Sequence, residues 1–87
     1  MRFDLVISDK ADKKFRKLLN KNRKQLEIVN KKILQIRETP HHYKPLRGDM
    51  YSTRRVHIDK SFVLLYEIDE VNKVVRILDY EHHDKVY

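Results

Sequence analysis

The sequence predicts one α+β domain, residues 1–87, in which a helical hairpin packs on one face of a mainly antiparallel sheet. Three observations lead to this fold class. A short alternating segment opens the chain, two amphipathic segments of helical period follow, and three apolar segments separated by turn residues come last. The element order is therefore β-α-α-β-β-β. With 87 residues, of which 40% are apolar, the chain is able to bury one thin core.

The chain opens with a strand and a first helix. Residues 2–7 place alternate apolar side chains on one face, as a strand does. Ser8 or Asp9 suits the N-cap of a helix at residues 10–20, because a short oxygen-bearing side chain accepts hydrogen bonds from amides of the first turn. The apolar stripe of this helix consists of Ala11, Phe15, Leu18 and Leu19.

A second helix is predicted at residues 23–38, after an asparagine-rich turn at residues 20–22. Pro40 ends it, since proline disfavours helical geometry in the residue before it. The faces opposite the apolar stripes are rich in Lys and Arg, so the two helices form an amphipathic hairpin laid on a sheet. The stripe of the second helix consists of Leu26, Val29, Ile33 and Ile36.

Three strands are predicted in the second half. A loop at residues 39–49 leads into a strand at residues 50–58, and a hairpin turn at residues 59–61 connects it to a strand at residues 62–68. The strand at residues 62–68 is apolar on both faces, which suits a central position in the sheet.

The last strand is expected at residues 74–80, after a turn at residues 70–73. Residues 81–87 contain aromatic and histidine rings together with Val86, so this tail is expected to dock on the domain. Because the helices cover one face of the sheet, the other face is left for a ligand.

The net charge of +7 favours polyanionic partners such as nucleic acid, acidic proteins or anionic membrane surfaces. Residues 10–37 carry eleven Lys and Arg against two acids. The alternative is that this basic helical surface merely keeps a small protein in solution.

Cysteine is absent, and the short apolar start is neither a signal peptide nor a membrane span, so a cytoplasmic location is expected.

The strand at residues 50–58 carries a candidate phosphate site. If its apolar residues face the helices, Arg55 and His57 share the open face. Arg grips phosphate oxygens in a fork and His transfers protons near neutral pH. Arg54 falls on the core-side row, near an edge where its guanidinium reaches the surface. An ordinary solvated strand face is the alternative.

Further candidate cations stand in the loop before this strand and in the last strand. Lys44 and Arg47 lie in the KPLRG turn, as a cationic rim around RNA or as a plain connector. Arg76 is a phosphate contact, or it forms a structural ion pair with Glu67 or Asp79.

Two histidine doublets are candidate metal ligands by residue type, His41–His42 and His82–His83. Thiolates and the HExxH spacing of zinc sites are both missing, so no metal site and no cofactor are predicted. The single glycine excludes a phosphate-cradling glycine loop, and none of the serines stands in a nucleophile elbow.

Taken together, these segments resemble the RelE/ParE superfamily of bacterial and archaeal toxins over nearly the whole chain. The most specific part is residues 44–87, in which KPLRG, RRVHI, FVLLYEID and HHDKVY follow one another. This set looks most like the YafQ-type branch, while the RR doublet and the PLRG turn are also similar to the YoeB-type branch. The resemblance implies a RelE-like microbial RNase fold and a toxin of a type II toxin–antitoxin module.

The resemblance also implies an activity and partners. RNase members of the family cleave mRNA without metal, typically in the ribosomal A site. The 2′-hydroxyl of the RNA attacks the scissile phosphate while a general base and a general acid move the protons. The implied partners are mRNA, the ribosome and a small acidic antitoxin that would form a hetero-oligomer with this basic chain, with no role for a membrane.

Site residues are carried over motif by motif. His57 and His83 match two histidines of the YafQ type and are expected to share the proton transfers, with the direction open. Tyr87 stands at the place of the terminal aromatic, and Arg55 is expected to bind the phosphate. These four form the catalytic set. The expected substrate-binding residues are Lys44, Arg47, Arg54, Phe62 and Arg76.

Three positions depart from the family patterns. Ser61 stands where the YafQ type has an acid before its aromatic, and Lys44 stands where that type has a histidine. Val63 stands where the YoeB and RelE types carry an arginine in the central strand. The missing acid or base has three candidate replacements, which the sequence leaves open: Asp59, Glu81 and Asp84.

Two other functions stay open at this point. A ParE-like member would share the fold and inhibit DNA gyrase instead of cleaving RNA. A non-catalytic module would bind RNA or the ribosome through the same basic surface, and neither histidine would then matter for its effect.

Overall fold

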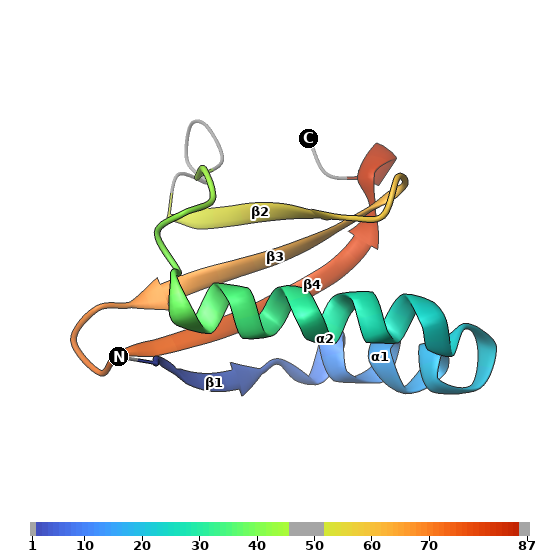
Figure 1. Ribbon diagram of the computed structural model, residues 1–87, viewed down its shortest axis with the longest axis horizontal. Helices are drawn as coiled ribbons and strands as arrows, with labels where there is room; N and C mark the ends of the chain where they lie inside the picture. The colour runs from blue at the N-terminus through green and yellow to red at the C-terminus, as the bar shows by residue number, and fades with distance from the viewer. Residues whose placement is uncertain (1, 46–51, 86–87) are drawn as a thin grey trace.

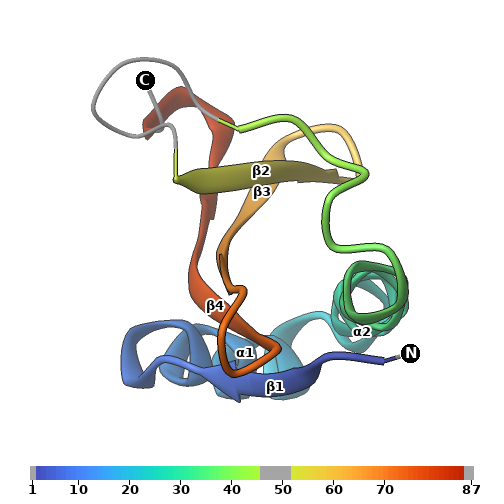
Figure 2. The ribbon, with the colours of Figure 1, turned by 90° about the vertical axis from the view of Figure 1, so that its left-hand side faces the viewer.

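The computed structural model describes residues 2–45 and 52–85, and its elements follow the predicted order (Figure 1). A four-stranded sheet carries both helices on one side, which confirms the predicted α+β fold (Figure 2). The strands are β1 (Asp4–Ile7), β2 (Thr53–Ile58), β3 (Phe62–Asp69) and β4 (Val74–His82). The helices are α1 (Asp9–Lys21), α2 (Arg23–Glu38) and a short 3-10 turn, η2 (His83–Lys85).

The strand order is β1-β4-β3-β2, with β1 parallel to β4 and the other neighbours antiparallel. The helical hairpin connects β1 to β2, which lie at opposite edges of the sheet. β4 is longer than predicted, because its pairing with β3 continues to Phe62 and His82. The first residues of the segment 81–87, which was expected to be a docked tail, therefore belong to β4. The predicted start of β2 at residues 50 and 51 lies outside the described residues, and the observed strand begins at Thr53.

An irregularity in β4 decides which of its side chains face the core. Leu65 pairs with Asp79 while Tyr66 pairs with Ile77, so Leu78 is a bulged residue. Simple alternation from Ile77 would place Asp79 on the core face. The bulge instead brings Tyr80 into the core and turns Asp79 to the other face, with Leu65.

The predicted cap Ser8 begins the hairpin, and Asn22, which was predicted only as a turn residue, caps its second helix. The Ser8 hydroxyl accepts a hydrogen bond from the Ala11 amide at 3.1 Å and donates one to the Leu78 carbonyl at 2.7 Å. Asn22 closes α1 with its amide and caps α2 with its side chain, which accepts from the Gln25 amide at 3.1 Å. The predicted turn at residues 20–22 was too long, because one asparagine serves both helices.

The core lies between the hairpin and the sheet. Leu19 was expected in it but is 46% exposed, whereas Gln25 is buried and donates to the Tyr80 hydroxyl at 3.0 Å. Phe15 and Leu18 cover the sheet in place of Leu19. The buried cluster consists of Ala11, Phe15, Val29, Ile33, Ile36, Val56, Ile58, Leu64, Tyr66, Val75, Ile77 and Tyr80.

Tyr66 provides a test of this core. Its side chain is fully buried, and its hydroxyl donates to the Pro40 carbonyl at 2.6 Å. Tyr66→Phe removes this donor and leaves a carbonyl without that partner, at a cost of about 1–2 kcal/mol in the free energy of unfolding. Urea unfolding followed by circular dichroism measures the loss. An unchanged midpoint would mean that the bond contributes nothing to stability.

Candidate functional site

The open face of the sheet carries a row formed by His57, Val63 and Glu81, which are paired across β2, β3 and β4. Paired residues of antiparallel strands project to the same face. Val63 is 1% exposed and lies outside the helix-side core cluster, while His57 is exposed beside it. The row therefore has an apolar centre with an imidazole at one end and a carboxylate at the other.

His83 lies at the same end of the sheet as His57. Its amide donates to the Ser61 carbonyl at 2.8 Å, which extends the pairing of β4 with β3 by one step. His57 pairs with Val63, two residues further along β3. With one strand between them and an offset of two residues along it, the two backbones are about 12 Å apart. Two side chains with one phosphate group between them can span that distance.

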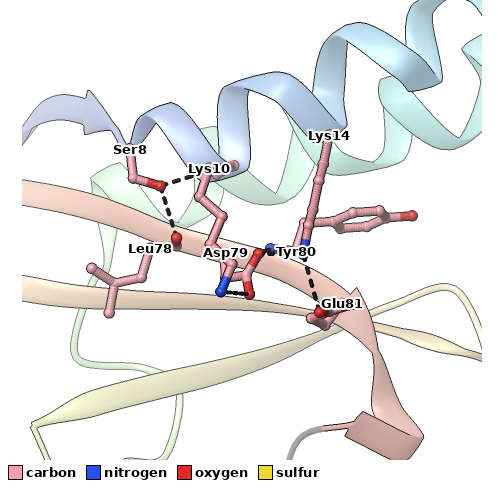
Figure 3. A network of polar contacts seen from close by, with 8 residues as sticks. Ser8, Lys10, Lys14, Leu78, Asp79, Tyr80 and Glu81 are labelled. Atoms are coloured by element: carbon pink, nitrogen blue, oxygen red, sulfur yellow. Dashed lines mark hydrogen bonds and ion pairs between the residues drawn. The ribbon is translucent and has the colours of Figure 1, made fainter.

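Lys14 joins helix α1 to this face (Figure 3). Its ammonium group lies 2.7 Å from an Asp79 carboxylate oxygen and 3.1 Å from a Glu81 oxygen. Lys10 approaches the second Asp79 oxygen at 3.2 Å. Beyond the end of the short strand β1, helix α1 thus holds the exposed edge of β4.

The charges of this network stabilise one another. Burial raises the pKa of Asp79, but hydrogen bonds from Lys14, the Tyr80 amide and Lys10 outweigh it and leave that pKa below its usual value. Burial lowers the pKa of Lys14, yet hydrogen bonds to Asp79 and Glu81 raise it above its usual value. Both shifts favour the charged pair.

Arg55 and Lys44 lie side by side along β2. Arg55 pairs with Leu65 on the open face, and its amide donates to the Lys44 carbonyl at 3.5 Å. Arg54 pairs with Tyr66 on the helix side, as predicted, and its guanidinium donates to the Tyr43 carbonyl. The structure therefore brings Arg55, and not Arg54, to the face that carries His57.

Arg76 and Phe62 lie away from the row. Arg76 contacts Asp69 at 3.1 Å and Glu67 at 3.8 Å, so an ion pair is present, with Asp69 in place of the Asp79 considered from sequence. Phe62 is on the helix side, where its ring stacks on Tyr80 with centroids 4.9 Å apart. The structure does not bring these two beside His57.

Two predicted site residues, Arg47 and Tyr87, lie outside the described residues. Lys14 was missed by sequence reasoning. It is one of many lysines in the hairpin, and nothing in its spacing distinguishes it from its solvated neighbours. Only the packing of α1 against β4 gives it carboxylate partners.

A pocket of about 380 Å³ opens beside this end of the sheet. It lies between the turn of the helical hairpin, the β2–β3 turn and the end of β4. Its wall contains two lysines, two carboxylates and two aromatic rings, and one of the lysines, Lys14, is paired with Glu81 at 3.1 Å. Its lining consists of Lys14, Lys17, Leu18, Asn22, Gln25, Asp59, Ser61, Phe62, Tyr80 and Glu81.

The Asp69 site predicts a dependence of stability on acid. Hydrogen bonds from the side chain and amide of Asn72, followed by Arg76, lower the pKa of Asp69 to about 2 against the opposing effect of burial. A carboxyl whose pKa falls on folding stabilises the protein above its ordinary pKa of 3.8, and this stabilisation is lost as the pH falls toward 2. Asp69→Asn should therefore flatten the decline of the urea midpoint between pH 5 and pH 2. An equally steep decline in the variant would contradict this.

No helix within residues 2–45 and 52–85 is long and apolar enough to cross a membrane.

Comparison with known proteins places the chain in a family. Residues 5–87 match the family model described as the ParE toxin of a type II toxin–antitoxin system. A protein from Methanocaldococcus jannaschii with the provisional name toxin RelE4 is 44% identical over 85 residues, covering 98% of this chain and 90% of that protein. A Methanosarcina mazei protein of uncharacterised function is 52% identical over 83 residues, covering 95% of this chain and 96% of that protein.

Solved toxin structures share the fold. A YoeB/ParE toxin from Agrobacterium tumefaciens has a TM-score of 0.83 at 18% identity, covering 92% of this chain and 98% of that one. The toxin–antitoxin complex RelBE2 from Mycobacterium tuberculosis contains a chain with a TM-score of 0.80 at 24% identity, covering 95% and 100%. A free-state mutant of the Escherichia coli toxin RelE has a TM-score of 0.81 at 25% identity, covering 99% and 88%. The chain belongs to the RelE/ParE superfamily, whose members are toxins of type II toxin–antitoxin systems.

Proposed function

We propose that this toxin is a metal-independent endoribonuclease that cleaves mRNA on the ribosome. The observation that carries the proposal is the placement of His57 and His83 at the same end of the sheet, with strand β3 between their backbones. Two imidazoles can divide the roles of general base and general acid between them. The likeness of residues 44–87 to the YafQ-type branch supports the same roles.

The reaction uses a nucleophile that belongs to the RNA. One histidine removes the proton of a 2′-hydroxyl, and the resulting oxygen forms a bond to the adjacent phosphorus. The bond from phosphorus to the 5′-oxygen breaks, and the second histidine protonates the departing oxygen. Arg55 stabilises the extra negative charge on the phosphorane. Of the three carboxylates left open by the sequence, Asp84 lies 3.0 Å from Nδ1 of His83, while Glu81 is separated from His57 by Val63.

Further parts of the proposal rest on the basic surface and on resemblance. The lysines and arginines of α1 and α2 hold ribosomal RNA by sequence-independent charge. Lys44 lies beside β2 at the edge of the open face, where it would contact the RNA backbone. Tyr87 and Arg47 enter by resemblance alone, as a base-stacking ring and a phosphate contact.

An acidic antitoxin is the expected protein partner. The Mycobacterium tuberculosis structure similar to this chain is a toxin–antitoxin complex. The net charge of +7 on this chain is complementary to an acidic partner that folds on binding. Such an antitoxin would form a hetero-oligomer with the toxin and cover the basic surface.

The chemistry of the product ends tests this mechanism. Attack by the 2′-hydroxyl leaves a 2′,3′-cyclic phosphate, or its 3′-phosphate hydrolysis product, on the upstream fragment and a 5′-hydroxyl on the downstream fragment. Purified toxin added to programmed ribosomes should give these ends, and a 2′-deoxy nucleotide at the mapped cleavage site should abolish the cut. Fragments with 5′-phosphate ends, or cleavage at the deoxy site, would contradict the mechanism.

Gyrase inhibition is the second candidate, because the family model matched by residues 5–87 is that of ParE toxins. A supercoiling assay with purified gyrase separates the two functions. The endoribonuclease proposal expects no inhibition of gyrase at concentrations that cleave mRNA. Gyrase-dependent DNA breaks together with intact mRNA would replace the proposal by the ParE-like function.

A further inference from the structure

Three consecutive side chains at the end of β4 converge on one point. The Nδ1 atom of His83 lies 3.0 Å from one oxygen of the Asp84 carboxylate, and the Nδ1 atom of His82 lies 3.4 Å from the other. The two imidazole rings stack with their centroids 4.8 Å apart. The three candidate ligand atoms all lie within 4.8 Å of one another.

The backbone fixes this group in place. The His83 amide is bound to the Ser61 carbonyl at 2.8 Å, and the ring of His82 rests edge-on against Phe62 with centroids 5.4 Å apart. The segment is therefore held to β3 by a hydrogen bond and by packing. A site held in this way loses little conformational freedom when it takes a ligand.

The hydrogen bonds show which nitrogen of His82 carries no proton. The Asp84 amide donates to Nδ1 of His82 at 3.2 Å. An amide can only donate, so this nitrogen carries a lone pair and no proton. The Asp84 oxygen 3.4 Å away is also an acceptor. A metal ion shared by this nitrogen and the carboxylate would use the lone pair that now accepts from the amide, and would replace that hydrogen bond by a coordination bond.

We propose that His82, His83 and Asp84 form a binding site for a late first-row divalent metal ion of the zinc class. Two imidazole nitrogens with one carboxylate oxygen match the preference of Zn²⁺, Ni²⁺ and Cu²⁺, with water completing the coordination. Metal–ligand bonds of about 2.0–2.1 Å keep the ligand atoms of one ion within about 4 Å of each other. A small rotation of one ring closes the widest gap.

The site has a consequence for activity, which rests on the proposed function. His83 is one of the two histidines assigned to proton transfer. A metal ion on its Nδ1 atom fixes the ring against Asp84 and places a positive charge beside the histidine. The bound ion therefore acts as an inhibitor of RNA cleavage and not as a cofactor.

Calorimetric titration of the purified full-length toxin with Zn²⁺ tests the site directly. We expect one equivalent to bind, no binding of Mg²⁺, and at least a tenfold loss of affinity in His82→Gln and in Asp84→Asn, since even outer-shell partners of a metal affect affinity by about 10–100-fold. The matched control is His42→Gln, in the other histidine doublet, which should bind as the wild type does. Unchanged affinity in both site variants, or an equal loss in the control, would overturn the site. If a variant no longer shows the circular dichroism spectrum of a folded protein, the wild type is titrated with Co²⁺ instead. The absence of d–d absorption bands would then overturn the site.

RNA cleavage tests the inhibitory role separately. Saturating Zn²⁺ should lower the cleavage rate of the wild type at least tenfold, and His82→Gln should keep its rate at the same Zn²⁺ concentration. Full activity of the Zn²⁺-loaded wild type would overturn the inhibitory role and leave the site intact. A wild type that cleaves no RNA without added Zn²⁺ would contradict the proposed function and with it the inhibitory role, while the titration would still decide the site.

Discussion

The His83→Ala variant is expected to cleave mRNA at least about a hundredfold more slowly than the wild type, and His57→Ala to show a loss of the same order. A positioned general acid or base contributes about 10²–10⁴-fold to the rate. Both histidines serve one reaction, so their effects should not add, and the double variant should fall to the same low level as the slower single variant. Single-turnover cleavage of mRNA on programmed ribosomes gives these rates.

His42→Ala is the matched control for this experiment. It removes a surface histidine from the loop after α2, where the ring contacts Tyr43 and not the open face. Its rate should stay within about twofold of the wild type, and all variants should keep the circular dichroism spectrum of the folded protein. Wild-type rates in both His57→Ala and His83→Ala would remove the two residues from the mechanism.

The second large effect is expected on stability, from Asp79→Asn. The Asp79 side chain is 11% exposed and bound to Lys14 and Lys10. Removing one partner of a buried ion pair costs about 3–5 kcal/mol, which is reduced here to about 2–3 kcal/mol because Lys14 is 28% exposed and recovers some hydration. For a domain of this size, that lowers the melting temperature by about 10–20 °C.

The pH dependence of this loss follows from the two pKa shifts. The contribution of Asp79 disappears as the pH falls through its lowered pKa, and that of Lys14 disappears as the pH rises through its raised pKa. The destabilisation by Asp79→Asn should therefore be constant between about pH 5 and pH 9. Calorimetric melting curves across this range measure it.

Arg16→Ala is the control for the stability experiment. It breaks a 2.9 Å ion pair with Asp12 on the exposed surface of α1, where such pairs contribute about 0.3–0.5 kcal/mol. If Asp79→Asn costs no more than Arg16→Ala, the network between α1 and β4 does not stabilise the fold.

Much of the fold could be predicted because local signals are strong in this chain. The bounds of α2 were predicted correctly, since its apolar stripe is regular and Pro40 prevents its continuation. Ser8 was one of two predicted caps and is the one observed. The bulge at Leu78 could not be predicted, because it depends on the pairing of β4 with β3 and has no composition of its own.

The candidate site was predictable only in part. His57 and Arg55 lie two residues apart on one strand and therefore share a face. This is a local property that follows from the sequence. The position of His83 could not be predicted, because it depends on a hydrogen bond from its amide to the carbonyl of Ser61, next to another strand. The partners of Arg76 and the stacking of Phe62 likewise arise from cross-strand register, which the sequence does not determine by itself.

Primer extension on an mRNA translated in an extract, with wild-type toxin beside His83→Ala, tests the central claim most directly. Ribosome-dependent RNA cleavage through His83 predicts cuts inside the translated frame with the wild type and their loss in the variant. Intact mRNA with both proteins, at concentrations that still bind ribosomes, would contradict the claim and identify a module that only binds.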